Sequence, residues 1–377
     1  MTDSFDSTPP TPAGMPKKVA GCNHPRGTHA PKHWVVAETL YEGREPTVLV
    51  DGKYPRRFAN LNRVTIAPNA AIARQLGLLV KQCLTSRRFT ADRTRLACGA
   101  SINMVAAPIA GPFGQVRAVT LWAGAVGEEL PPPPQVGVVE WDAEVVVSAS
   151  AAARSLLLDD KPVGQTMLPE MLACFDRFDD RFDFLALLRL SDPVDQWIGG
   201  ATRTFVDGTM HRLHLGARAC GTGVARAVRA VVCDITDVEP PVAPDVYSRA
   251  LRHAPIPAGH ALALIDLSGF VIHDWVANHG DPIGMWAHHR PLLHPDDRQQ
   301  IRATGFEMLV GTRTTASVRV RIRFDAADEW IELESHWTRI VTGAQPQVLA
   351  DIALVGSMPP SIVDMCTRCR LLSEGAA

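Results

Sequence analysis

Alternating apolar and polar residues form the clearest local pattern of the chain, in the segment 318–324. Val318, Val320, Ile322 and Phe324 fall on one face of an extended backbone, and three arginines fall on the other. A period of two with β-branched residues predicts a half-buried strand of an antiparallel sheet. We interpret the arginines as the solvated face of this strand rather than as a phosphate-binding stripe.

A helix is predicted directly before this strand. The sequence LHPDDR places Pro295 at a helix start, and Asp296 and Asp297 put negative charge beside the free N–H groups of the first turn. A modest apolar stripe follows and ends at Gly311, which is a natural C-terminal stop.

The N-terminal third contains a second helix pattern and a hairpin. Asn69 follows a proline and is the predicted N-cap of a helix over residues 69–86. Its apolar face consists of Ile72, Leu76, Leu79, Val80, Cys83 and Leu84. Two apolar runs, 102–109 and 115–122, are separated by the turn formers AGPFG, which predicts two paired strands.

The region after the tetraproline Pro131–Pro134 repeats itself. VVEWDAEVVV matches ALIDLSGFVI, with Asp142 and Asp266 at the same place, and strand-like segments with Asp234 and Asp351 close the two copies. The proline run is a stiff break between domains. We therefore predict an N-terminal tail, three domains and a C-terminal tail, over residues 1–30, 31–130, 136–238, 245–356 and 357–377.

These elements resemble known sensor domains. The predicted hairpin 102–122 resembles the end of a GAF domain. The LHPDDR helix with its long strand, the helix-rich segment 167–190 and the DITD sequence at 234–237 resemble PAS domains. The chain is thus similar to actinobacterial, mycobacterial-type GAF–PAS–PAS triple-sensor proteins over residues 31 to about 356. The resemblance implies an α+β fold of three domains, each a central antiparallel sheet flanked by helices, without an output domain.

Composition excludes several other classes of protein. The chain has 377 residues, 46% apolar and 21% charged, with a net charge of −2, which is typical of a soluble globular protein and gives no nucleic-acid footprint. It has no apolar stretch long enough for a membrane span and no apolar signal segment, so we expect a cytoplasmic location. A homodimer is compatible with these features.

The sharpest short motif is the pair Cys366 and Cys369, spaced as CxxC near the C-terminus. A structural zinc site needs four ligands, and a second CxxC is absent. Partners would have to come from the other tail, from Cys22, His24, His29 and His33. We expect ordinary reduced thiols without metal, with a zinc site or a redox dithiol as the alternatives.

Tryptophans and histidines gather in the last repeat. A small-molecule pocket is predicted between the helical region 285–293 and the strands 318–324 and 330–337. Its candidate residues are Trp275, Trp286, His288, His289, Trp330 and Trp337. Each can equally be a core or surface residue. The first repeat contains AAARSLLL and LALLRL, which should close its interior. Neither haem nor flavin is expected.

The sequence favours a binding role over catalysis. It contains no P-loop, GxSxG or HExxH motif. We therefore expect a non-enzymatic sensor or adaptor that binds a small molecule or unidentified signalling proteins and needs no cofactor. The alternatives are a GAF-type methionine sulfoxide reductase using Cys83 or Cys98, and a redox or zinc protein using the CxxC pair. Cys83 lies on the apolar face of its helix and should be unreactive.

Overall fold

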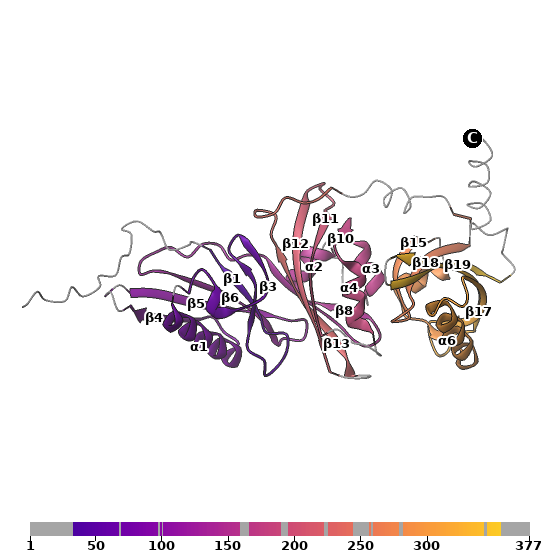
Figure 1. Cartoon of the computed structure of the whole chain (residues 1–377), viewed down its shortest axis with the longest axis horizontal. Helices are drawn as coiled ribbons and strands as arrows, with labels where there is room; N and C mark the ends of the chain where they lie inside the picture. The colour runs from indigo at the N-terminus through magenta and orange to yellow at the C-terminus, as the bar shows by residue number, and fades with distance from the viewer. Residues whose placement is uncertain are drawn as a thin grey trace, which may run out of the picture.

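The computed structural model describes residues 33–67, 69–96, 99, 101–158, 166–189, 195–221, 225–243, 256–257, 259–278, 282–342 and 345–355. The two predicted tails and Cys98 lie outside the described residues, as do Cys22, Cys366 and Cys369. Within the described part, the strands form three antiparallel sheets, here named A, B and C, which lie in a row along the molecule (Figure 1). None of the described helices is long and apolar enough to span a membrane.

Sheet A has the strand order β3-β2-β1-β6-β5-β4. Its strands are β1 (Val35–Glu38), β2 (Thr47–Asp51), β3 (Tyr54–Asn60), β4 (Thr90–Arg95), β5 (Ser101–Ala110) and β6 (Val116–Ala125). A short 3-10 helix, η1 (Leu61–Arg63), follows β3. Helix α1 (Ala70–Ser86) covers one face, and Asn69 Oδ1 accepts from the N–H groups of Ala71 and Ile72. The predicted helix with its N-cap and the predicted β5–β6 hairpin are confirmed.

Sheet B has the order β10-β11-β12-β13-β7-β8-β9. Its strands are β7 (Val136–Trp141), β8 (Val146–Ala149), β9 (Thr166–Met167), β10 (Arg177–Phe178), β11 (Gln196–Thr204), β12 (Met210–Cys220) and β13 (Ala227–Asp234). Its helices are short: α2 (Ala151–Leu157), α3 (Leu168–Ala173), α4 (Arg181–Leu185) and the 3-10 helix η2 (Ala186–Leu188). The side chains of these helices pack against one face of the sheet.

Sheet C has the order β15-β14-β19-β18-β17-β16. Its elements are β14 (His260–Asp266), β15 (Val271–Asn278), the 3-10 helix η4 (Ile283–Ala287), β16 (Leu292–Leu293), α6 (Pro295–Leu309), β17 (Thr315–Arg323), β18 (Ile331–Thr342) and β19 (Gln345–Leu354). Its first strand pairs with the second and the last strand, as β7 pairs with β8 and β13 in sheet B. The two sequence repeats therefore form sheets with the same central strand order.

Sheets A and B pack face to face. One apolar cluster lies between them, made of Val36, Leu40, Leu49, Val50, Ala118, Val136, Val231, Cys233 and Ile235. Gly216 of β12 lies against Leu49, and a Cβ added to it would fall 2.5 Å from Leu49 Cδ2. The missing side chain thus allows the two sheets to approach closely.

The predicted fold class, helix-flanked GAF and PAS sheets, is wrong. The molecule consists mainly of three curled antiparallel sheets with few helices. Helices α3 and α4, in the segment 167–190, have only six and five residues. Strands β1 and β7 are buried along their whole length, because sheets A and B cover each other. A continuous apolar strand shows that both faces are covered, but not whether a helix or a second sheet covers them.

Helix α6 begins at Pro295, as the sequence predicts, but an unexpected residue caps it. The ring nitrogen Nδ1 of His294 accepts from the N–H of Asp296 at 3.3 Å. The helix ends at Leu309, and Gly311 follows it with φ +82°, which confirms the predicted stop.

The predicted strand over 318–324 is confirmed except at its last residue: β17 ends at Arg323, and Val318, Val320 and Ile322 are buried. Its arginines are not simply a solvated face. Arg321 donates from Nε and Nη2 to the carboxylate of Asp297 at 3.0 and 2.6 Å, and these hydrogen bonds lower the pKa of Asp297. This pair ties the start of α6 to the sheet.

Candidate functional site

The core of sheet C contains an apolar cavity of about 110 Å³. It lies between the strands, helix α6 and η4. Its lining residues are Ile265, Phe270, Ile272, Trp286, Leu293, Ile301, Val320, Ser335, Trp337 and Ile352. Apolar cavities of roughly 150 Å³ bind benzene-sized molecules, so the space suits a small apolar group.

One hydroxyl lies in this apolar lining. Ser335 Oγ accepts a hydrogen bond from Trp337 Nε1 at 2.8 Å, and both residues are buried. They are two positions apart on β18 and so face the same side of the strand. The hydrogen bond holds the Trp337 indole against the cavity wall and leaves the Ser335 O–H available as a donor.

The predicted ligand residues separate into two groups. Trp286 and Trp337 line the cavity, and the Trp275 ring lies edge-on to Trp286 at 5.9 Å. By contrast, His288 and His289 are exposed outside it. Their role in ligand binding, like that of the whole predicted set, stays a prediction.

Trp330 lies apart from the cavity lining. Its ring lies 4.8 Å from the His294 ring, and the guanidinium of Arg323 lies 4.4 Å above it. It therefore packs at the edge of sheet C near the start of α6. Trp330 is therefore a tryptophan of the same sheet that does not line the cavity.

Sequence reasoning missed Phe270, which lies in the turn between β14 and β15. Its φ is +54°, a conformation that costs energy for a bulky residue. The adjacent residue Gly269 could adopt a positive φ at lower cost, but it is Phe270 that does so. Its ring packs over Gly305 of α6, where an added Cβ would fall 1.7 Å from Phe270 Cζ. The sequence LSGF indicates a turn, but it does not show which of its residues takes the positive φ. The one sequence signal for this contact is the glycine in the middle of α6.

The corresponding space in sheet B is filled by aromatic rings. Trp141, Phe175, Phe178, Phe184 and Trp197 contact one another with ring centroids 5.2 to 5.5 Å apart. Sequence reasoning expected small and aliphatic side chains in this interior, and the observed cluster contains aromatic side chains as well as aliphatic ones. The two related sheets thus differ in how their interiors are filled.

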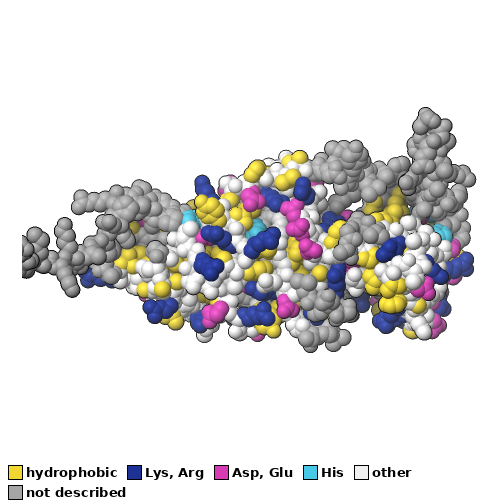
Figure 2. Space-filling view, viewed as in Figure 1, with side chains coloured by type: hydrophobic (Ala, Val, Ile, Leu, Met, Phe, Trp, Pro, Cys, Tyr) yellow, Lys and Arg dark blue, Asp and Glu magenta, His cyan; other side chains and the backbone are white. Residues whose placement is uncertain are grey.

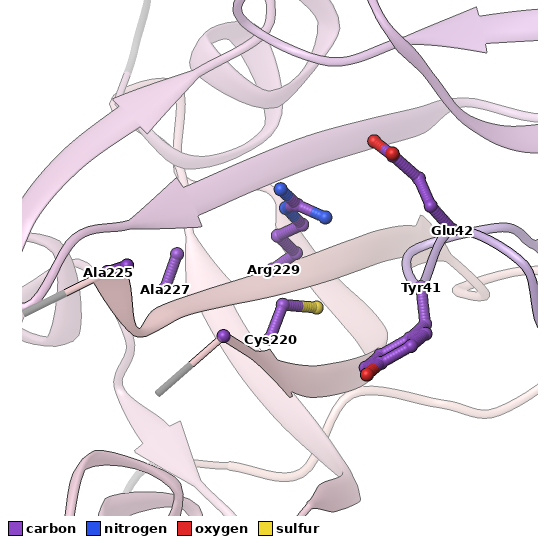
Figure 3. Close-up of a pocket in the computed structure, with 7 residues that line it drawn as sticks. Tyr41, Glu42, Cys220, Ala225, Ala227 and Arg229 are labelled. Carbon is purple, nitrogen blue, oxygen red and sulfur yellow. The ribbon is translucent and has the colours of Figure 1, made fainter. Parts of the chain in front are cut away.

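A second pocket, of about 240 Å³ and with a mixed polar and apolar lining, lies where sheet A meets sheet B (Figure 3). Tyr41 and Glu42 come from the loop after β1, and Cys220 and Arg229 come from β12 and β13. Cys220 Sγ donates to the Leu40 carbonyl at 3.6 Å, and burial raises the pKa of its thiol. A protonated, enclosed thiol is a poor nucleophile.

Buried charges hold this interface together. Glu140 accepts from Arg117 Nε at 2.8 Å and from Arg229 Nε at 3.3 Å. Arg218 donates to Glu38 at 2.8 Å across the same interface. All but Arg229 are almost fully buried, so these pairs fix the relative position of the two sheets.

A buried hydrogen-bonded chain lies in sheet C. Gln347 Nε2 donates to Asp266 at 2.9 Å, and Gln347 Oε1 accepts from His273 Nε2 at 2.9 Å. His273 is only 1% exposed, and burial lowers its pKa to about 4, assisted by the charge of Arg181. His273 is therefore neutral at neutral pH.

This chain predicts a loss of stability in weak acid. An unfolded histidine binds a proton near pH 6.5, whereas folded His273 does so near pH 4. Between these values the unfolded state holds more protons, so stability falls as pH falls. From pH 7.5 to 5, His273 should lower the free energy of unfolding by about 2 kcal/mol. Urea titration of wild type and His273→Gln, which keeps a donor to Gln347, measures the difference; equal losses in both proteins would contradict it.

The described part of the chain offers neither a reactive thiol on α1 nor a metal site. Cys83 is fully buried on α1, and burial raises the pKa of its thiol, as its place on the apolar face predicts. Among the described residues, no three His, Cys, Asp or Glu side chains are close enough to hold a metal ion. Figure 2 shows basic and acidic side chains interspersed over the face in view.

Comparisons with known proteins extend these observations. The family model "Rv3651-like, N-terminal" matches residues 33–134, which contain sheet A. The solved structure of an uncharacterized protein from Mycobacterium tuberculosis superposes with a TM-score of 0.65 at 19% identity, covering 86% of this chain and 96% of that one. The chain therefore has the fold of a mycobacterial protein. No curated protein matches it.

Two further solved structures are much less similar. An RNA-binding light-oxygen-voltage receptor has a TM-score of 0.23 at 11% identity, covering 63% of this chain and 99% of that one. The Escherichia coli DhaR(N)–DhaL complex has a TM-score of 0.20 at 11% identity, covering 54% and 80%. Similarities this low carry no argument about fold or function.

Proposed function

We propose that this protein acts by binding, and that sheet C holds a small apolar molecule in the cavity beside Trp286 and Trp337. The observation that carries the proposal is the unfilled apolar space in sheet C, at the place where aromatic rings fill sheet B. Protein interiors are normally close-packed, so an apolar space in one of two related cores suits a ligand.

Ligand binding can be transmitted to sheet B through η4. This element carries Trp286, and the residues after it contact sheet B: His288 Nδ1 lies 3.2 Å from Glu170 of α3, and Arg290 pairs with Glu144. A ligand that moves Trp286 would change these contacts. The change would favour some relative positions of sheets B and C over others. This is the behaviour of a sensor or adaptor.

Three of the four described cysteines do not favour the alternative of a thiol enzyme; the fourth, Cys174, is half-buried and donates from Sγ to the Glu170 carbonyl at 3.4 Å. Cys83, Cys220 and Cys233 are all buried, and burial raises the pKa of each thiol. A thiol enzyme needs an accessible thiolate with a lowered pKa. Non-catalytic binding is therefore the better-supported function.

Toluene is a suitable neutral probe for the cavity. We expect saturable quenching or enhancement of tryptophan fluorescence in the wild-type protein, because the probe would contact two indole rings. Trp286→Phe should lose at least half of the change. Trp330→Phe is the matched control, since Trp330 lies outside the cavity lining, and it should keep the change. Absence of a saturable signal, or equal signals in both variants, would refute the proposed site.

A further inference from the structure

A groove of about 660 Å³ lies beside the cavity, between sheets B and C. Its lining residues are Glu144, Val146, Phe270, Arg290, Pro291, Leu292, Leu293, Arg298, Ile301 and Arg302. Phe270, Leu293 and Ile301 line both the groove and the cavity. The groove is therefore the natural entrance to the cavity, and the half-exposed Phe270 ring lies at the boundary between them.

The groove has an excess of positive charge. It contains three arginines and one carboxylate, and that carboxylate, Glu144, is paired with Arg290. Within the described residues, no carboxylate lies within ion-pairing distance of Arg298 or Arg302. These two arginines are one turn apart on α6, so each raises the energy of the other until an anion lies near them.

Ile301 connects the charges to the apolar space. It is three residues after Arg298 and next to Arg302, so the α6 face that borders the cavity also carries both unpaired guanidinium groups. An apolar cavity with a cationic entrance is complementary to a molecule with an apolar body and an acidic end.

We infer that the ligand of sheet C is a small amphipathic acid, with its apolar body in the cavity and its anionic head group on Arg298 and Arg302. The inference rests on the proposed function and adds the class of ligand. The head group would offset the repulsion between the two arginines, while Trp286 and Trp337 would contact the body.

Phenylacetate and phenylacetamide form a matched pair of probes, because they have the same shape and differ by one charge. We expect the wild-type protein to bind phenylacetate at least tenfold more tightly than phenylacetamide, measured by titration calorimetry. The double variant R298Q/R302Q should bind both probes with the affinity that the wild type has for phenylacetamide. Arg313→Gln is the control: Arg313 is an exposed arginine beyond the end of α6, and its loss should change neither affinity.

The outcomes separate this inference from the proposed function. Equal wild-type affinities for the two probes, or full discrimination retained in R298Q/R302Q, would overturn the acidic ligand but leave a neutral cavity ligand in place. Failure of toluene and both of these probes to bind would instead overturn the binding function itself. Circular dichroism confirms folding of the double variant, which removes a repulsive pair and should not destabilise α6.

Discussion

Replacing Ile322 with aspartate should destabilise the protein by about 4 kcal/mol or more. Ile322 is fully buried in the core of sheet C, where β17 pairs with β16 and β18. A carboxylate there would lose its hydration without gaining a partner, and the apolar contacts of the isoleucine would also be lost. Urea titration followed by far-ultraviolet circular dichroism measures the loss.

Arg319→Ala is the matched control on the same strand. Its side chain is 64% exposed and lies 3.9 Å from Glu334, so its removal should cost less than about 1 kcal/mol. Arg321 is a poorer control, because its two hydrogen bonds to Asp297 hold α6 on the sheet. Similar losses for Ile322→Asp and Arg319→Ala would show that β17 does not bury one face as described.

Local elements with a strong period were predictable from the sequence. Helix α1 with its cap at Asn69 and strand β17 with its buried Ile322 follow from residue patterns alone, because each element buries one regular face. The packing of sheet A on sheet B was not predictable. A strand that is buried on both faces has no alternating pattern, so its sequence does not show which face meets the other sheet. The close contact of Gly216 with Leu49 leaves no periodic pattern either.

The candidate site was predictable only in part. Trp286 and Trp337 could be proposed because aromatic residues often line pockets, and both do line the cavity. The same argument included Trp330, which does not line the cavity. The sequence position of a tryptophan does not show which residues it will contact. Arg298 and Arg302 were overlooked, because exposed arginines on a helix are ordinary until the structure places them at the entrance of a cavity.

Removing the Glu140 carboxylate should destabilise the contact between sheets A and B by about 3–5 kcal/mol. Glu140 is 7% exposed and lies between the guanidinium groups of Arg117 and Arg229. Glu140→Ala would leave two positive charges facing each other with little water to screen them. Urea titration of the full chain, followed by circular dichroism, measures the loss in free energy of unfolding.

Glu42→Ala provides the decisive comparison, because Glu42 also pairs with Arg117, at 3.4 Å, but its side chain is 80% exposed. Water and counterions replace an exposed carboxylate, so this variant should lose less than about 1 kcal/mol. Both substitutions remove a carboxylate from Arg117, but only Glu140 is buried and only Glu140 also pairs with Arg229. A loss for Glu140→Ala as small as that for Glu42→Ala would mean that the apolar cluster around Leu49, and not the ion pairs, holds the two sheets together.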